Sequence, residues 1–173
     1  LEQYNDFTAD PIVHDGFYCG RYGGIEEKDY LEKYLALYEL GQQFGITVAQ
    51  ENVNGFRSAN PSFIRRMREQ LQNCCAFVFD VKQAVRAGFD PYDMCDAMGK
   101  NLIHVHINDN APSQDCLLPG NGTMDYPRLL RQLKQQDYHG SFIIEVYRRN
   151  FEKLEELNSS AMYLNEKLSK YFG

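Results

Sequence analysis

The arrangement of short apolar runs along the chain most constrains its fold. Four runs are rich in β-branched and aromatic residues and are flanked by Gly, Asn or Pro; they span residues 46–52, 75–81, 102–109 and 141–147. Such runs are typical of buried strands. A fifth, shorter strand is predicted at residues 11–15. The segments between the runs are long enough to hold a helix, which is the connection that parallel neighbouring strands require.

Helical segments alternate with these strands. Asn or Asp followed by Pro is a good start signal, because the first residue caps the helix and proline suits its first position. The predicted helices span residues 25–44, 126–136 and 151–171, with two more that begin at Asn60-Pro61 and Asp90-Pro91. Strand and helix alternate five times, which predicts an α/β fold with a parallel sheet.

The composition limits the class of protein. With 43% hydrophobic residues, residues 1–173 are predicted to form a single domain. No apolar run reaches the roughly 18 residues that a transmembrane helix requires, and no secretory leader pattern opens the chain. The five cysteines follow no disulfide or metal-knuckle pattern, so reduced thiols and a cytoplasmic location are predicted. A net charge of -6 argues against nucleic acid as the main partner.

Four residues able to bind a metal lie near the ends of the four longer runs: Glu51, Asp80, His106 and Glu145. In a (β/α)8 barrel the C-terminal ends of the strands converge on one mouth, so these side chains are predicted to meet. Three carboxylates and one imidazole suit one divalent ion, Mn, Mg or Co, and tolerate Zn. His104 shares the face of His106 one layer deeper, and it is predicted to be a hydrogen-bonded interior residue.

A metal site of this kind predicts Lewis-acid chemistry. A dication surrounded by three carboxylates still lacks ligands, so a substrate with adjacent oxygens can chelate it. If those oxygens are a carbonyl and the neighbouring hydroxyl, the charge that builds on oxygen during removal of the intervening C–H proton is neutralised directly. A base beside that carbon completes the requirement.

Several segments also carry a resemblance to a known family, from roughly residue 10 to the end. They are VAQENVNG, FVFDVKQAVRAGFDP, HVHINDN, LPGNGTMDYPRLL and GSFIIEVYR. Together they resemble the C-terminal part of the sugar phosphate isomerase/epimerase family. That family is one of the xylose-isomerase-like TIM barrels, a superfamily that also includes ketose 3-epimerases, inosose dehydratase and endonuclease IV.

The resemblance implies a ligand set and a reaction. Glu51, Asp80, His106 and Glu145 would bind one divalent ion, commonly Mn, Mg, Co or Zn, and the two glutamates would act as paired acid and base. The predicted function is a metal-dependent isomerase or epimerase that acts on a sugar, sugar phosphate or related polyol through a metal-stabilised enediolate. Returning the proton to the other face gives epimerisation, and returning it to the adjacent carbon gives isomerisation.

Further residues are predicted to contact the substrate: His14, Lys82, Gln83 and Arg148. The spacing of His14 from the first ligand resembles that of a substrate-contacting histidine in related barrels. Lys82 shares the face of Asp80, so it is predicted to meet a substrate phosphate or carboxylate, although lysines at barrel rims are commonly solvated. Arg148, just past the last run, is a similar candidate.

Alternative functions stay open. Inosose-type dehydration uses the same first step and then expels a β-hydroxyl. An incomplete barrel that binds a metal or carbohydrate without turnover is a second alternative. Endonuclease IV-like hydrolysis ranks lower, because Gln83 stands where those relatives usually carry histidine, and Asp115 is followed by Cys116 and Leu117 rather than by an Asp-x-His pair.

The chain is short for a complete barrel. A full (β/α)8 TIM barrel takes about 250 residues, whereas this chain offers five βα units in 173 residues. The predicted fold is therefore a partial barrel that corresponds to its C-terminal part, with about three N-terminal units missing. An uncovered edge strand tends to pair, so a homo-oligomer, in the simplest case a dimer, is predicted.

Overall fold

The sheet is parallel and follows the order of the sequence. The computed structural model describes residues 25–173 together with the backbone of residues 12–14. Its five-stranded sheet has the order β1-β2-β3-β4-β7, and every neighbouring pair is parallel. The strands are β1 (Ile12–His14), β2 (Thr47–Glu51), β3 (Phe77–Asp80), β4 (Leu102–Ile107) and β7 (Ser141–Ile144). The predicted parallel α/β fold is confirmed.

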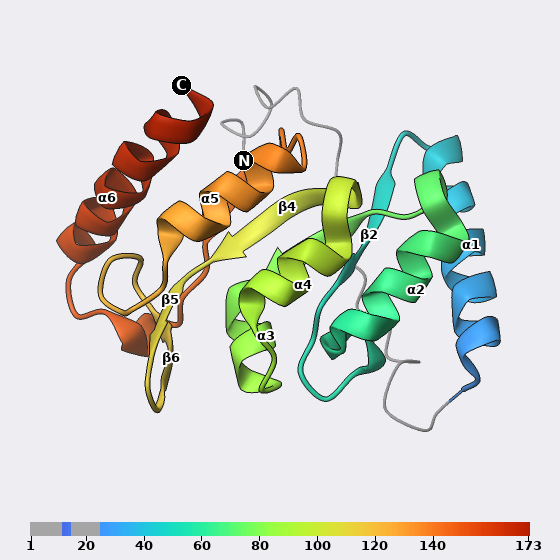
Figure 1. Cartoon of the computed structure of the whole chain (residues 1–173), viewed down its shortest axis with the longest axis horizontal. Helices are drawn as coiled ribbons and strands as arrows, with labels where there is room; N and C mark the ends of the chain where they lie inside the picture. The colour runs from blue at the N-terminus through green and yellow to red at the C-terminus, as the bar shows by residue number, and fades with distance from the viewer. Residues whose placement is uncertain (1–11, 15–24) are drawn as a thin grey trace.

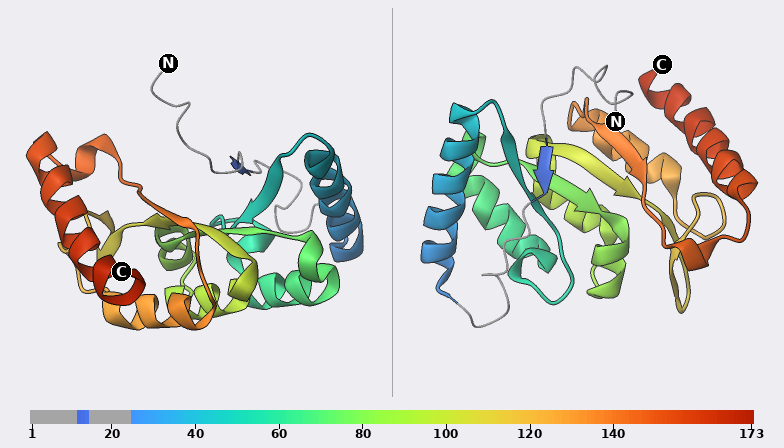
Figure 2. Two further views of the ribbon diagram at one scale, coloured as in Figure 1. Left: turned by 90° about the horizontal axis from the view of Figure 1, so that it is seen from above. Right: turned by 180° about the vertical axis from the view of Figure 1, so that it is seen from behind.

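The helices cover one face of this sheet. They are α1 (Glu27–Gln43), α2 (Pro61–Leu71), α3 (Val81–Arg86), α4 (Pro91–Met98), α5 (Tyr126–Gln135) and α6 (Leu154–Phe172). In Figure 1, α2, α4 and α5 lie across the front of the sheet, with α1 and α6 at its two sides. Seen from above in Figure 2, these helices follow an arc around the strands. The fold is thus part of a (β/α)8 barrel, as predicted.

The predicted helix start signals are confirmed in their hydrogen bonds. The side chain of Asn60 accepts a hydrogen bond from the Ser62 N–H at 2.9 Å and caps α2. Asp90 accepts one from the Tyr92 N–H at 2.8 Å and caps α4. These side-chain oxygens satisfy backbone donors that have no partner inside the first turn of a helix.

Two features of the fold differ from the prediction. Helix α3 follows β3 at once, in a segment for which no separate helix was predicted. The long loop after β4 contains an antiparallel hairpin of two short strands, β5 (Asp109–Ala111) and β6 (Gln114–Leu117). Both elements lie at the end of the sheet where the strands finish, and α3 carries Lys82 into the site described below.

The main core lies between the sheet and the helices. Phe77 and Phe79 of β3 are fully buried and belong to the same cluster as Val105 of β4 and residues of α2 and α5. The alternate position, Val78, belongs to a second buried cluster with Ala49 of β2. Because side chains alternate across a strand, Asp80 follows Val78 on this second face. Val78 and Asp80 therefore lie on the face of β3 opposite to Phe77 and Phe79.

The last strand leaves one edge of the sheet open among the described residues, because β7 pairs only with β4 there. Its Ile143 is 50% exposed. The dimer that would cover such an edge stays a prediction. Among the described helices, none is both long and apolar enough to cross a membrane. The four cysteines within the described residues are free, as predicted, and Cys19 lies outside them.

Candidate metal centre

The four predicted ligands come together at the C-terminal end of the sheet. Glu51 and Asp80 are the last residues of β2 and β3, His106 lies in β4, and Glu145 follows β7 directly. Each offers one ligand atom, and these atoms all lie within 4.8 Å of one another. The register explains the meeting, because Asp80 pairs with His106 across β3 and β4, and His106 pairs with Ile143 of β7.

The two carboxylate oxygens of Asp80 have different partners, one in a helix and one in the site. Its Oδ1 atom accepts a hydrogen bond from the Gln83 N–H at 3.2 Å and caps α3. Its Oδ2 atom lies 3.2 Å from the Lys82 ammonium nitrogen. The side chain is almost completely buried. Since Oδ1 is committed to the helix, Oδ2 is the atom of this carboxylate that is left to a cation.

His106 lies between the two glutamates. Its Nδ1 atom is 3.1 Å from Glu51 Oε1 and 3.1 Å from Glu145 Oε2. The ring also meets His104 edge-on, with centroids 5.1 Å apart. His104 is buried, which confirms its predicted place in the interior. The imidazole therefore links the two carboxylates that the resemblance assigns to acid–base chemistry.

The charges of this cluster shift the protonation of its members. Burial lowers the pKa of His106, but hydrogen bonds with Glu145 and Glu51 outweigh it and raise the pKa to about 9. The hydrogen bond from His106, with help from Lys82, lowers the pKa of Glu145 to about 2. Burial raises the pKa of Asp80 to about 6. Positive charge thus gathers on His106 and Lys82 and negative charge on Glu145.

The donor set fits a divalent metal ion. Carboxylate oxygens and imidazole nitrogens bind such ions at about 2.0 to 2.6 Å, so two ligands on opposite sides of an ion lie roughly 4 to 5 Å apart. The observed spread of at most 4.8 Å meets this requirement. Three carboxylates in so small a volume also repel one another, and a dication relieves that repulsion.

We predict that the metal-free protein loses stability as the pH rises past neutrality. The pKa of His106 is raised in the folded state, so its contribution is present below about pH 6.5, the pKa in the unfolded chain, and it is lost as the pH passes about 9. The expected loss is about 2 to 3 kcal/mol. Urea unfolding in the presence of a chelator, at both ends of this range, measures it.

The control for this prediction is His106→Gln. Burial also raises the pKa of the Cys75 and Cys95 thiols, so these two groups likewise lower the stability of the folded protein at high pH. They remain in the variant, so the difference between the two proteins isolates the histidine. An equal loss of stability in both proteins would contradict the assigned contacts.

Two buried asparagines position the ligands, and the sequence analysis did not single them out. Asn52 donates to the carbonyl of Asp80 and accepts from its N–H, both at 2.8 Å, which fixes the end of β2 to the end of β3. Asn108 donates to the carbonyl of Glu145 at 3.5 Å. Both side chains are fully buried. The sequence feature that could have indicated them is an asparagine close behind a predicted ligand: Asn52 directly follows Glu51, and Asn108 lies two residues after His106.

The four predicted substrate contacts have different positions in the structure. Lys82 joins the ligand cluster. Gln83 lies beside it, but its Oε1 atom accepts a hydrogen bond from the Asn54 N–H at 3.0 Å. Arg148 donates to the carbonyls of residues 151 and 152, at 2.5 and 3.2 Å. The side chain of His14 lies outside the described residues. Substrate contact by His14, Lys82, Gln83 and Arg148 stays a prediction.

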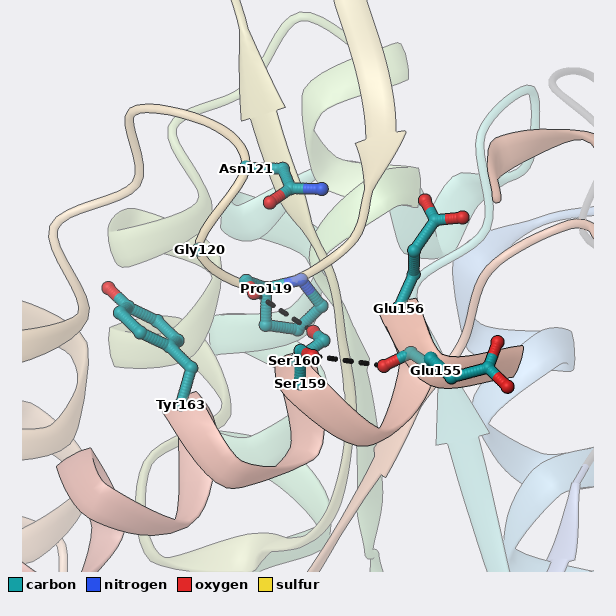
Figure 3. A pocket seen from close by; sticks show the side chains of 8 residues that line it. All are labelled: Pro119, Gly120, Asn121, Glu155, Glu156, Ser159, Ser160 and Tyr163. Atoms are coloured by element: carbon teal, nitrogen blue, oxygen red, sulfur yellow. Dashed lines mark hydrogen bonds between the residues drawn. The ribbon is translucent and has the colours of Figure 1, made fainter. Parts of the chain in front are cut away.

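A separate hollow lies beside the loop at 118–122 and the start of α6. Its volume is about 300 Å³, and its lining includes Gly120, Glu155, Glu156 and Tyr163 (Figure 3). Glu156 accepts from the N–H of Lys153 at 2.7 Å and so caps α6. None of the four predicted metal ligands lines this hollow. We therefore treat the cluster of four ligands as the functional site.

The chain resembles several known proteins. The rhizopine catabolism protein MocC of Rhizobium meliloti is 24% identical over 177 residues, which cover 84% of this chain and 54% of that protein. A D-tagatose 3-epimerase-like protein superposes with a TM-score of 0.69 at 22% identity, over 92% of this chain and 62% of that one. The IOLI protein with a bound zinc atom gives a TM-score of 0.69 at 18% identity, over 94% and 63%.

A family model shows the family of the chain, and the similar proteins show how much of a complete member it spans. The chain spans about half the length of MocC and less than two thirds of the two solved structures. The family model of the xylose isomerase-like TIM barrel matches residues 4–167. The chain belongs to the xylose isomerase-like TIM barrel family.

Proposed function

We propose that this chain carries the metal site of a divalent-metal-dependent isomerase or epimerase that acts on a sugar, sugar phosphate or related polyol. The observation that carries the proposal is the convergence of four ligand atoms from four neighbouring strands within 4.8 Å. The epimerase-like and zinc-containing structures of the same fold support it. Glu51, Asp80, His106 and Glu145 would hold the ion, and Mn, Mg, Co and Zn all suit these donors.

The chemistry follows from the placement of the two glutamates. When bound, the divalent ion supplies Lewis-acid polarisation of a substrate carbonyl. Glu145 is in the proton-accepting form and takes the proton from the carbon beside that carbonyl, while the electron pair of the broken C–H bond moves toward the carbonyl oxygen. Glu51 returns a proton to the opposite face. In the metal-free protein, His106 holds the two carboxylates in place through its 3.1 Å contacts.

A second candidate is a barrel that binds a metal or carbohydrate without turnover. The chain spans 62% of the epimerase-like structure. The other βα units of a complete barrel also contribute loops to the mouth where substrates bind. Inosose-type dehydration is a variant of the first candidate, in which a β-hydroxyl leaves after the same proton is removed.

Solvent-proton exchange tests the proposal. The protein is incubated with Mn²⁺ and a panel of ketoses, ketose phosphates and inososes in deuterated water, and deuterium at the carbon beside the carbonyl is followed by NMR. We expect incorporation together with formation of an epimer or isomer. A new dehydrated product would instead identify dehydration.

Three other results would overturn the proposed isomerase. Binding of Mn²⁺ by calorimetry with no deuterium incorporation would favour the binding barrel. Cleavage of a duplex that contains an abasic site, with no reaction on the sugar panel, would favour hydrolysis of a phosphodiester. Absence of Mn²⁺ binding would remove the first step of the proposed reaction.

A further inference from the structure

Lys82 is a buried lysine inside the ligand cluster. Its side chain is only 2% exposed, and its ammonium nitrogen lies 2.9 Å from Glu145 Oε1 and 3.2 Å from Asp80 Oδ2. A lysine is rarely this deeply buried unless its charge is paired. Lys82 was predicted to meet a group on the substrate, and that contact stays a prediction. In the structure it meets two of the four candidate ligands.

Neighbouring elements hold Lys82 in this position. The residue lies in the first turn of α3, and the helix is fixed to the site by the Asp80 cap. The ring of Tyr147 lies 5.2 Å from the ammonium nitrogen. Arg86, four residues further along α3, has partners outside the ligand set. It donates a hydrogen bond to the Tyr147 hydroxyl at 2.8 Å and pairs with Asp115. The ammonium group is therefore directed at the carboxylates.

We infer that Lys82 is a resident counter-cation, which neutralises the carboxylates of the metal-free site and must yield its contacts before a divalent ion binds. The decisive atom is Asp80 Oδ2. Since Oδ1 caps α3, a metal ion needs the same oxygen that the ammonium group contacts. The ammonium group also contacts Glu145 Oε1, at 2.9 Å. The ammonium group and the metal ion thus compete for the same lone pairs, and their positive charges repel each other.

This competition has two consequences. Lys82 lowers the affinity of the site for a divalent ion, and it stabilises the protein when no ion is bound. Without its charge, the carboxylates would repel one another in the metal-free protein and would bind a metal ion more tightly. The inference rests on the proposed metal site, but it makes no use of the reaction.

Calorimetric titration of Mn²⁺ into the metal-free protein tests the inference. Lys82→Met keeps the aliphatic stem and removes the charge, and Lys82→Gln keeps a hydrogen-bond donor. We expect both variants to bind Mn²⁺ at least about tenfold more tightly than the unaltered chain. We also expect both to melt at a lower temperature without metal, with a larger rise in melting temperature on addition of Mn²⁺. Equal or weaker binding in both variants would overturn the inference.

Lys28→Met is the matched control. Lys28 pairs with Glu32 at 3.7 Å on the exposed face of α1, so the same change of charge is made at an exposed pair outside the ligand cluster. We expect its Mn²⁺ affinity to equal that of the unaltered chain. If the Lys82 variants are unfolded without metal, circular dichroism follows their refolding as Mn²⁺ is added. Failure of Mn²⁺ to restore the fold would then count against the inference.

The two proposals fail separately. If the Lys82 variants bind Mn²⁺ more tightly but the protein exchanges no substrate proton, the counter-cation stands and the isomerase does not. If the protein exchanges substrate protons and the variants show unchanged affinity, the isomerase stands and the counter-cation does not.

Discussion

Glu145→Gln is expected to lower the rate of deuterium incorporation by a factor of about 10² to 10⁴, the usual contribution of a positioned acid–base group. Glutamine has nearly the size of glutamate but cannot accept the substrate proton. It also removes the charge that His106 and Lys82 contact at 3.1 and 2.9 Å. The measurement is NMR of the substrate carbon in deuterated water, made with enough Mn²⁺ to saturate both proteins.

Saturation with Mn²⁺ matters because Glu145 is both a candidate ligand and the candidate base. Weaker metal binding alone would be restored by more Mn²⁺, whereas loss of the base would not. Glu155→Gln is the control, since Glu155 is an exposed residue of α6 that lines the separate hollow. Exchange at the unaltered rate in Glu145→Gln would show that another group removes the proton.

Asp80→Asn is expected to weaken Mn²⁺ binding by at least about 100-fold, which exceeds the usual effect of losing a supporting partner of a ligand. Asparagine caps helices as well as aspartate does. Its oxygen can keep the hydrogen bond from the Gln83 N–H that begins α3, so the helix is retained while the charged ligand is lost. Calorimetric titration of the metal-free protein measures the affinity.

Asp90→Asn provides a close control for this change. Asp90 caps α4 in the same way, through the Tyr92 N–H at 2.8 Å, but it is not among the four candidate ligands. We expect its Mn²⁺ affinity to match that of the unaltered chain. Retained affinity in Asp80→Asn would mean that the carboxylate of residue 80 serves the helix and Lys82 but binds no metal.

The strands and the meeting of the ligands could be predicted because both depend on short-range regularities. Apolar runs of strand length, joined by helix-length segments, leave few topologies other than a parallel sheet. Once the strands are parallel, residues at their C-terminal ends must lie on one edge. Asp80 and His106 could therefore be placed together before their register was known.

Other features depend on contacts that the pattern does not show. Helix α3 begins on the side chain of Asp80, so the same residue ends a strand and starts a helix with no loop to mark the change. The hairpin of β5 and β6 is too short for a clear alternation of apolar and polar residues. The direction of Lys82 depends on that unpredicted helix, which is why a lysine expected to meet substrate lies against Glu145.

The strand order of the sheet also sets the sequence of events during synthesis. Each of β2, β3 and β4 pairs with the strand made just before it, so a growing chain can add one βα unit at a time without waiting for distant segments. Glu145 follows β7, which comes after β4 in the chain. A nascent chain that has released only β2 to β4 from the ribosome therefore holds an incomplete ligand set, and it cannot capture an ion prematurely with all four side chains.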